Sequence, residues 1–467
     1  MEIRNVLVYG RDFLFHPGSV RVKGGTIRSV TLVERQGGSG INESKPAHEI
    51  KKDRNHVNHE IIDGEGAYLI PGLIDLHFHG AVGADVCDAS EEALAAIAEY
   101  ELSVGVTSLC PATMTLPVSD LNHILANIAA YAKKQKKESD PFSRRGESAE
   151  NFTCAVERYR PQASYVGVNM EGPFISRAKK GAQDGSKIIP FSMEVLEGFL
   201  SASEGLVRFI GIAPEENRDQ LDFIREVKNR VAVSLAHTNA DYDTAKRAFD
   251  LGASHAVHLY NAMPAYSHRA PGVVGAVCDS PWVGAELITD GVHIHPSVVR
   301  ATFRMMGEER MILISDSMRA TGMPDGTYTL GGLEVVKEGK YARLASDGAL
   351  AGSVSNLADC MRTAVGEMGL PLETAVRAAT FNPAREMGLA DQIGSIGPGM
   401  RADLLLMDRD LRLKALRLFG KKPMPSWGGD LDDIDFDNIK YFVRSTERQA
   451  QTWEDLPEDI KNTYDRL

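Results

Sequence analysis

Residues 69–85 read LIPGLIDLHFHGAVGAD, and this stretch raises the questions of fold and of chemistry together. An apolar run leads into His77 and His79, which are followed by glycines. Side chains two residues apart on a β-strand point to the same side, so the two imidazoles are predicted to face one spot. A metal site and a solvated polar strand end both explain such a pair, and the rest of the chain has to distinguish them.

Apolar runs of this kind recur along the chain. They alternate, for the most part, with amphipathic helical patterns, and eight of them are found, at residues 73–79, 104–112, 165–174, 207–215, 231–238, 253–263, 284–293 and 311–318. Strand–helix alternation with nearly continuous apolar strands is typical of a parallel sheet covered by helices. Eight such units predict an α/β fold, a (β/α)8 TIM barrel over residues 67–396.

The two ends of the chain read as strands without helices between them. Polar and apolar residues alternate around glycine-containing turns, which is typical of hairpins. We therefore predict a small β-sandwich domain built from residues 1–66 and 397–420. Residues 133–151 are predicted to be a surface insertion, and residues 421–467 an extra tail of unknown role. A polar loop is expected at 34–60, and its histidines are weak ligand candidates: His48, His56 and His59.

The composition limits the partners. The 467 residues carry a net charge of -12, with 43% hydrophobic and 25% charged residues. No broad basic surface is therefore expected to bind nucleic acid or an acidic membrane. The five cysteines are scattered and form no CxxC motif, which favours a reducing compartment. The first residues lack a signal-peptide pattern, and no apolar run of about 20 residues occurs. We expect a cytoplasmic protein that acts on a small molecule.

Polar residues stand where the predicted barrel strands end. Besides the histidine pair, they are Glu171, His237, His258, Asp290, His293 and Asp316. Strand ends converge at the mouth that carries the chemistry in this fold, and histidine with carboxylate suits zinc or iron(II). Such an ion activates a water, whose proton Asp316 is placed to take and hand to a leaving amine. Each residue alone also has a structural explanation, but their coincidence predicts hydrolysis of an amide or related C–N bond.

Several motifs together resemble the N-acetylglucosamine-6-phosphate deacetylase family of the amidohydrolase superfamily. They are PGLIDLHFHG, MEGPF, AHTNA, HLYNAMPAYSHRAPGVVGA, ITDGVHIH, ISDSM and LAGS, and the resemblance covers roughly residues 1–420. It implies that Glu171, His237 and His258 hold the main metal and that Asp316 is the catalytic acid/base. It also implies that Arg269 grips the sugar phosphate from the partner subunit of a homodimer. Further substrate contacts are implied at Ala182, Asn261, Ala262, His293, Leu350, Ala351, Gly352 and Ser353.

The resemblance leaves the number of metals open, because some members of the family lack the first histidine pair and use one ion. This chain keeps His77 and His79, so one or two divalent ions per subunit are expected, with the pair and Asp316 holding the second and Glu171 able to bridge. Other members carry a histidine that orients the acetyl carbonyl, and Gln183 stands at that place. The role of Gln183 is therefore open.

Three alternatives remain at this point. In the first alternative the substrate is N-acetylgalactosamine 6-phosphate, because the two epimers differ only in the orientation of one hydroxyl. The barrel is a catalytically dead scaffold used for binding, which predicts a missing ligand or base. A dihydroorotase-like hydrolase is the third, although such sites favour a carbamylated lysine on a middle strand, where Glu171 stands here.

Overall fold

The computed structural model describes residues 1–33, 60–139 and 161–419. All of these residues lie in one compact unit. The histidines at 48, 56 and 59 and the tail from 421 fall outside the described residues. Within them, no helix combines the length and the apolar character needed to cross a membrane.

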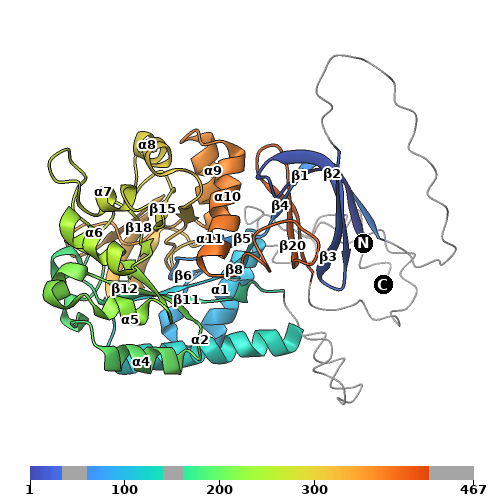
Figure 1. The fold of residues 1–467 in the computed structure, drawn as a ribbon. Coiled ribbons are helices and arrows are strands. Elements are labelled where there is room, and N and C mark those ends of the chain that lie inside the picture. The colour runs from blue at the N-terminus through green and yellow to red at the C-terminus, as the bar shows by residue number, and fades with distance from the viewer. Residues whose placement is uncertain (34–59, 140–160, 420–467) are drawn as a thin grey trace, which may run out of the picture. The chain divides into compact units, whose positions relative to one another are not determined.

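Parallel strands form the centre of the molecule (Figure 1). Their hydrogen-bonded order is β16-β15-β14-β13-β12-β11-β9 in one sheet and β10-β8-β5 in another. The strands are β5 (Leu73–Asp75), β8 (Val106–Leu109), β9 (Ala112–Thr113), β10 (Ser164–Tyr165), β11 (Val168–Phe174), β12 (Val207–Ile212), β13 (Ala232–Leu235), β14 (His255–Ala256), β15 (Gly284–Ile288) and β16 (Met311–Ile314). Each of the eight predicted segments thus contains a strand, and the second and third are each split into two short strands.

The parallel sheet curls so that its first and last strands meet. After β16 ends, the Asp316 amide donates to the His77 carbonyl over 2.9 Å, and the His79 amide donates to the Ser317 carbonyl over 2.7 Å. The two sheets are joined where β8 and β9 are separated by only two residues, as are β10 and β11. This mixed α/β arrangement is consistent with a TIM-like barrel.

Helices cover the outside of the sheet (Figure 1). They begin at residues typical of N-caps: the Ser90 hydroxyl accepts from the Ala93 amide, and the Asp241 carboxylate accepts from the Thr244 amide. The α-helices are α1 (Glu91–Ser103), α2 (Val118–Ser139), α4 (Met193–Ala202), α5 (Phe223–Val227), α6 (Tyr242–Leu251), α7 (Gly272–Cys278), α8 (Pro296–Met306), α9 (Leu357–Gly366), α10 (Leu372–Ala379) and α11 (Phe381–Glu386). Residues 133–139, predicted as part of an insertion, continue α2, and residues 140–151 lie outside the described residues.

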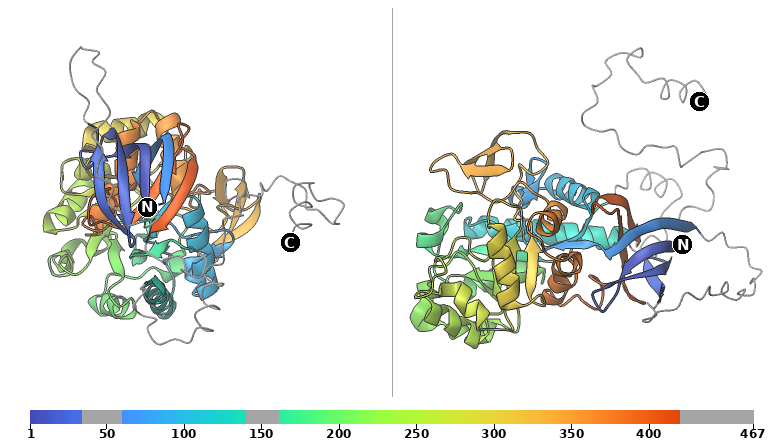
Figure 2. Two further views of the ribbon diagram at one scale, coloured as in Figure 1. Left: turned by 90° about the vertical axis from the view of Figure 1, so that its right-hand side faces the viewer. Right: turned by 90° about the horizontal axis from the view of Figure 1, so that it is seen from above.

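Strands from the two ends of the chain lie side by side in one sheet, as Figure 2 shows in its left view. Their order is β21-β20-β4-β1-β2-β3. They are β1 (Glu2–Tyr9), β2 (Phe15–Lys23), β3 (Thr26–Leu32), β4 (Ile61–Pro71), β20 (Ala402–Met407) and β21 (Leu413–Phe419). The sheet has its own apolar core, which includes Val8, Ile27 and Leu404. Strands from both ends of the chain thus pair in one sheet, and β4 continues past residue 66 to Pro71, one residue before β5 begins.

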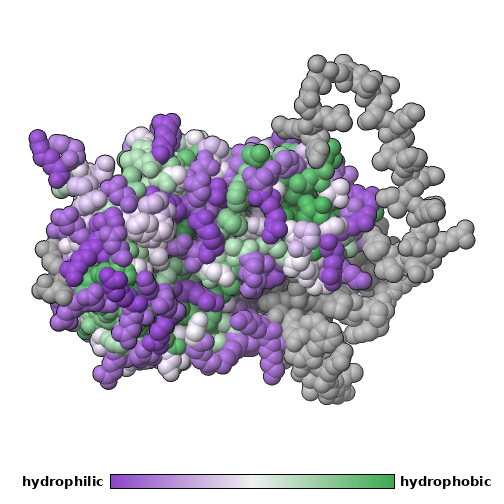
Figure 3. All heavy atoms as spheres, viewed as in Figure 1, coloured by the Kyte–Doolittle hydropathy of each residue, from purple (hydrophilic) through white to green (hydrophobic). Residues whose placement is uncertain are grey.

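Two further sheets extend the fold. A hairpin joins β6 (Gly80–Ala81) and β7 (Ala84–Asp85), and an antiparallel sheet of β17 (Gly326–Leu330), β18 (Leu333–Glu338) and β19 (Tyr341–Leu344) lies between β16 and α9 in the chain. The latter packs Leu330, Val335 and Leu344 into a small core. Hydrophilic side chains cover much of the face in Figure 3. Exposed large apolar side chains also occur, and four belong to or adjoin the six-stranded sheet: Leu14, Leu32, Val33 and Ile61.

Candidate metal centre and substrate pocket

Three side chains from strands of the seven-stranded parallel sheet converge near its carboxyl edge. Glu171 lies in β11, and His237 and His258 follow β13 and β14. Oε1 of Glu171 lies 2.8 Å from Nε2 of His237 and 2.8 Å from Nε2 of His258, and the two Nε2 atoms are 3.2 Å apart. Two imidazole nitrogens and one carboxylate oxygen thus face a common point.

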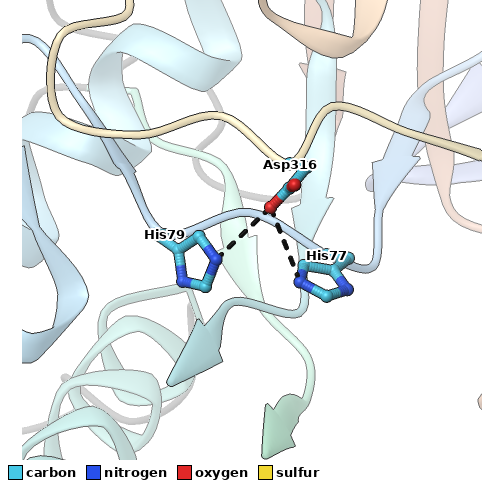
Figure 4. A group of neighbouring side chains, drawn as sticks. All are labelled: His77, His79 and Asp316. Atoms are coloured by element: carbon cyan, nitrogen blue, oxygen red, sulfur yellow. Dashed lines mark ion pairs between the residues drawn. The ribbon is translucent and has the colours of Figure 1, made fainter. Parts of the chain in front are cut away.

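A second group lies beside the first, built from His77, His79 and Asp316 (Figure 4). Oδ1 of Asp316 is 3.3 Å from Nε2 of His79 and 3.7 Å from Nε2 of His77. The histidines come directly after β5, which ends at Asp75, and not from within the strand as predicted. Asp75 ends the strand locally because its carboxylate accepts a hydrogen bond from the His77 amide over 3.2 Å. All three side chains are buried.

The backbone is strained where these groups leave their strands. His237, His258 and Asp316 have φ angles of 42°, 26° and 49°, in the left-handed region that non-glycine residues avoid. Each lies two residues after the last residue of its strand, and the turn directs the side chain toward the mouth. Strain of this kind costs on the order of 1–3 kcal/mol per residue and clusters at functional sites.

The donor sets fit divalent cations. Histidine nitrogens and carboxylate oxygens are the ligands that zinc and iron(II) use in proteins, and in each group the ligand atoms lie within 4.8 Å of one another. The buried Nε2 of His77 has no hydrogen-bond partner among the described residues, so this nitrogen is available to bind an ion. Nδ1 of His237 is 2.9 Å from the Lys179 carbonyl, to which it donates, and this leaves Nε2 free to bind an ion.

The electrostatics keep the carboxylates ionised. Burial alone would raise the pKa of Glu171, but His237 and His258 hold that pKa well below its usual range. The pKa of Asp316 is lowered as well: burial opposes this, and His79 and His77 outweigh it. A carboxylate at Asp316 is therefore the form present at neutral pH, which is the form a proton acceptor requires.

A cavity of about 200 Å³ opens onto the two groups. Six of the predicted substrate residues line it: Ala182, Asn261, Ala262, His293, Leu350 and Gly352. His293 is oriented by Asp290, whose Oδ2 lies 2.8 Å from Nδ1 of the imidazole. Burial would lower the pKa of His293, but this carboxylate raises it.

Three predicted substrate residues do not line this cavity. Ala351 is buried in the core of the β17–β19 sheet. Ser353 is buried too, and its amide donates to the Asp316 carbonyl over 2.7 Å, which restrains the backbone of Asp316. Arg269 is exposed on the loop before α7 and forms no ion pair within the described part of the chain.

Sequence reasoning missed several residues around the site. Met114 and Leu330 line the cavity, but an apolar residue in a strand or hairpin carries no signal of its own. Glu286 lies inside β15, and its Oε2 contacts Nδ1 of His77. Its position within the apolar run GAELI indicated only a buried strand and gave no sign of this contact. Gln183 was noted, but its contacts with Glu171 and Thr115 could not be foreseen.

Comparisons with known proteins agree with this architecture. Residues 68–438 match the Amidohydrolase family. The N-acetylglucosamine-6-phosphate deacetylase of Bacillus subtilis (strain 168) is 32% identical over 394 residues, covering 84% of this chain and 94% of that enzyme. The N-acetylgalactosamine-6-phosphate deacetylase of Escherichia coli O157:H7 is 33% identical over 362 residues, covering 77% and 89%.

The solved structures include an N-acetyl-D-glucosamine-6-phosphate deacetylase mutant from Mycobacterium smegmatis in complex with N-acetyl-D-glucosamine-6-phosphate. It has a TM-score of 0.72 and 29% identity, and the match covers 90% of this chain and 97% of that one. Together with the paired histidine and carboxylate groups, these matches define an amidohydrolase. Within that superfamily, the chain belongs to the N-acetylglucosamine-6-phosphate deacetylase family.

Proposed function

We propose that this protein hydrolyses the acetamide of N-acetyl-D-glucosamine 6-phosphate to D-glucosamine 6-phosphate and acetate, with a divalent metal ion, in amino-sugar catabolism. The observation that carries the proposal is the convergence of Oε1 of Glu171 with the Nε2 atoms of His237 and His258, beside Asp316. The relatives that act on this sugar phosphate support the substrate.

Glu171, His237 and His258 would hold the main ion, zinc or iron(II), and His77, His79 and Asp316 a second one. A divalent cation in such a site lowers the pKa of water toward neutrality and polarises a carbonyl oxygen. The protein orients the ligands: the Lys179 carbonyl fixes the tautomer of His237, and Glu286 does the same for His77. Because the ligand atoms are buried, bulk water does not reach them, and their electrostatic interactions are stronger than they would be in water.

Asp316 is the proposed acid and base. Its carboxylate accepts the proton of the attacking water and passes it to the amine nitrogen as the C–N bond breaks, so the proton taken in the first step is returned in the second. Its backbone is held from two sides, since its amide donates to the His77 carbonyl and its carbonyl accepts from the Ser353 amide. Such restraint keeps the carboxylate aimed at the reacting atoms.

The substrate would occupy the 200 Å³ cavity. His293, held by Asp290, would contact the acetamide or sugar, and the backbone of Asn261 and Ala262 would lie near the phosphate. The remaining contacts would come from Ala182, Leu350 and Gly352. The phosphate would be gripped by Arg269 of the partner subunit in a homodimer, because a guanidinium matches phosphate oxygens with two hydrogen bonds. The exposure of Arg269 is compatible with this role.

One alternative substrate has specific support. The relative from Escherichia coli O157:H7 is named for N-acetylgalactosamine 6-phosphate and is as similar as the others. The two sugars differ in the orientation of one hydroxyl, which a single loop can read. A dead scaffold is disfavoured because every expected ligand and the expected base are in place.

The proposal extends to the organisation of the chain. Residues 67–396 would form a closed (β/α)8 hydrolase barrel, and residues 1–66 with 397–420 a small β-sandwich domain, followed by the tail at 421–467. We place the protein in the cytoplasm, which the free thiols of the described cysteines favour: Cys87, Cys110, Cys278 and Cys360.

The test is acetate release from a panel of N-acetylated sugars, with metal analysis of the same sample. We expect fastest release from N-acetylglucosamine 6-phosphate, slow release from the unphosphorylated sugar, and one or two equivalents of zinc or iron per chain. Faster release from N-acetylgalactosamine 6-phosphate would favour the alternative. No release from either sugar phosphate by metal-loaded protein would refute deacetylation.

A further inference from the structure

The carboxamide of Gln183 lies between the carboxylate of Glu171 and the backbone of Thr115, which follows β9. Its Oε1 accepts from the Thr115 amide over 2.7 Å, and its Nε2 donates to Oε2 of Glu171 over 2.7 Å. The Thr115 amide can only donate and the ionised Glu171 can only accept, so the orientation of the carboxamide follows from its partners. Gln183 is 2% exposed although it adjoins the cavity.

We infer that Gln183 is a positioning residue for Glu171, and that it does not donate to the acetyl carbonyl of the substrate. The inference rests on the proposed metal role of Glu171. The short Nε2 contact to Oε2 occupies one Nε2 hydrogen, and the sulfur of Met114 lies 3.8 Å from the same nitrogen. The polar ends of the side chain are thus already used within the protein.

This contact gives the two carboxylate oxygens of Glu171 different partners. Oε2 is tied to Gln183, while Oε1 faces the Nε2 atoms of His237 and His258. Oε2 is 3.5 Å from Nε2 of His79, so the same hydrogen bond holds it back from the second group. The chain therefore presents one Glu171 oxygen to the main ion and leaves the second group to its own three ligands.

Replacing Gln183 leaves two buried groups, the Thr115 amide and Oε2 of Glu171, without their partner. Residues that hold a metal ligand from behind cost about 10–100-fold in metal affinity when mutated. A lost donor to the reacting carbonyl would instead cost about 10²–10³-fold in kcat. Metal affinity and turnover at saturating metal therefore separate the two roles.

The experiment measures the zinc dissociation constant of purified protein by competition with a chromophoric chelator. Gln183→Met keeps the length of the side chain and removes both hydrogen bonds, and Gln183→Ala serves as a second variant. We expect zinc affinity to fall about 10–100-fold, with KM unchanged at saturating zinc. Unchanged zinc affinity in both variants, with kcat reduced at saturating zinc, would overturn the inference.

Gln135→Met is the matched control. Gln135 is also buried, its Nε2 donates to the Ala163 carbonyl over 2.9 Å, and its Oε1 accepts from the Tyr165 amide over 3.0 Å, but none of these residues belongs to the metal groups. Zinc affinity should be unchanged in this variant, and an equal loss would show that Gln183 acts only through stability. Glu171→Ala tests the site itself. If that variant keeps its zinc affinity, the proposed metal ligand is wrong, and a failure confined to Gln183 leaves it standing.

Discussion

Two buried glutamates of the barrel are each flanked by two histidines, yet they are built for different tasks. Glu171 offers a single oxygen, Oε1, to the Nε2 atoms of both His237 and His258. Glu286 divides its partners: Oε2 lies 2.8 Å from Nδ1 of His77, and Oε1 lies 2.8 Å from Nε2 of His255. Glu286 is fully buried, whereas Glu171 adjoins the cavity.

The difference lies in whether lone pairs remain. Around Glu286 the hydrogen bonds are completed by the His258 amide at 3.0 Å and by Nδ2 of Asn169 at 3.3 Å. Around Glu171 the two imidazole nitrogens face each other at 3.2 Å, and no arrangement of protons lets both donate to one oxygen without crowding. The same residue types therefore form a closed ion-pair network when their contacts disperse and a candidate metal site when they converge.

The largest effect on turnover is expected for a substitution at the mouth of the barrel, and this substitution should leave the free energy of unfolding nearly unchanged. We expect Asp316→Asn to lower kcat about 10²–10⁴-fold, since the group that accepts and returns the proton is removed, with the ion at Glu171 retained. Acetate release, metal analysis and thermal unfolding on the same preparation check this. Near-normal turnover in the variant would remove Asp316 from its role.

The interior network should show the reverse pattern. Removing one partner of a buried ion pair costs about 3–5 kcal/mol, so we expect Glu286→Gln to lower the free energy of unfolding by an amount in that range. Denaturant titration in the presence of a chelator measures it without metal. Glu171→Gln is the matched control and should cost clearly less under those conditions, and equal losses would erase the distinction between the two glutamates.

The buried ion pairs around Glu286 should also make the free energy of unfolding depend on pH. Burial would lower the pKa of His255, but Glu286 and Glu386 raise it from 6.5 to about 9. The folded state then holds a proton that the unfolded chain releases, so this stabilisation is complete below pH 6.5 and is lost as the pH rises toward 9. The loss should be on the order of 2–3 kcal/mol. Unfolding free energies at intervals between pH 6 and pH 9 should decline in the native protein and decline less in His255→Gln, in which His77 still contributes because Glu286 raises its pKa against the effect of burial. Equal declines in the two proteins would remove His255 from this role.

The smallest effect is expected at an exposed charge that belongs to neither glutamate. Arg269→Ala should reduce kcat/KM for the phosphorylated sugar by about one to two powers of ten, the value of a lost charged hydrogen bond of about 1.5–3 kcal/mol. Hydrolysis of unphosphorylated N-acetylglucosamine serves as the control and should be unaffected. An equal reduction for both sugars would show that Arg269 does not bind phosphate.

The contrast between the two glutamates also marks how far the sequence could be interpreted. Asp316 was predicted because polar residues directly after apolar strands must gather where those strands converge. Glu171 was predicted as the end of the third strand, but β11 continues past it to Phe174. Glu286 was missed because it lies inside the apolar run of β15, where period and composition indicate only a buried strand. The exact end of β5 was missed because it involves a local contact between the Asp75 carboxylate and the His77 amide that the apolar pattern does not reveal. The role of Gln183 stayed open because it depends on a contact with a distant segment at Thr115.

The sheet of β17, β18 and β19 has a consequence for how such an enzyme diversifies. It inserts between β16 and α9, it carries its own small core, and from it Leu330 reaches the cavity, while the metal groups come from other strands. One wall of the substrate pocket is thus a separate module. On the proposed function, substitutions or length changes in this module would alter which sugar fits while the proposed ion and its ligands stay in place, so members of the family could exchange substrates without rebuilding the reaction.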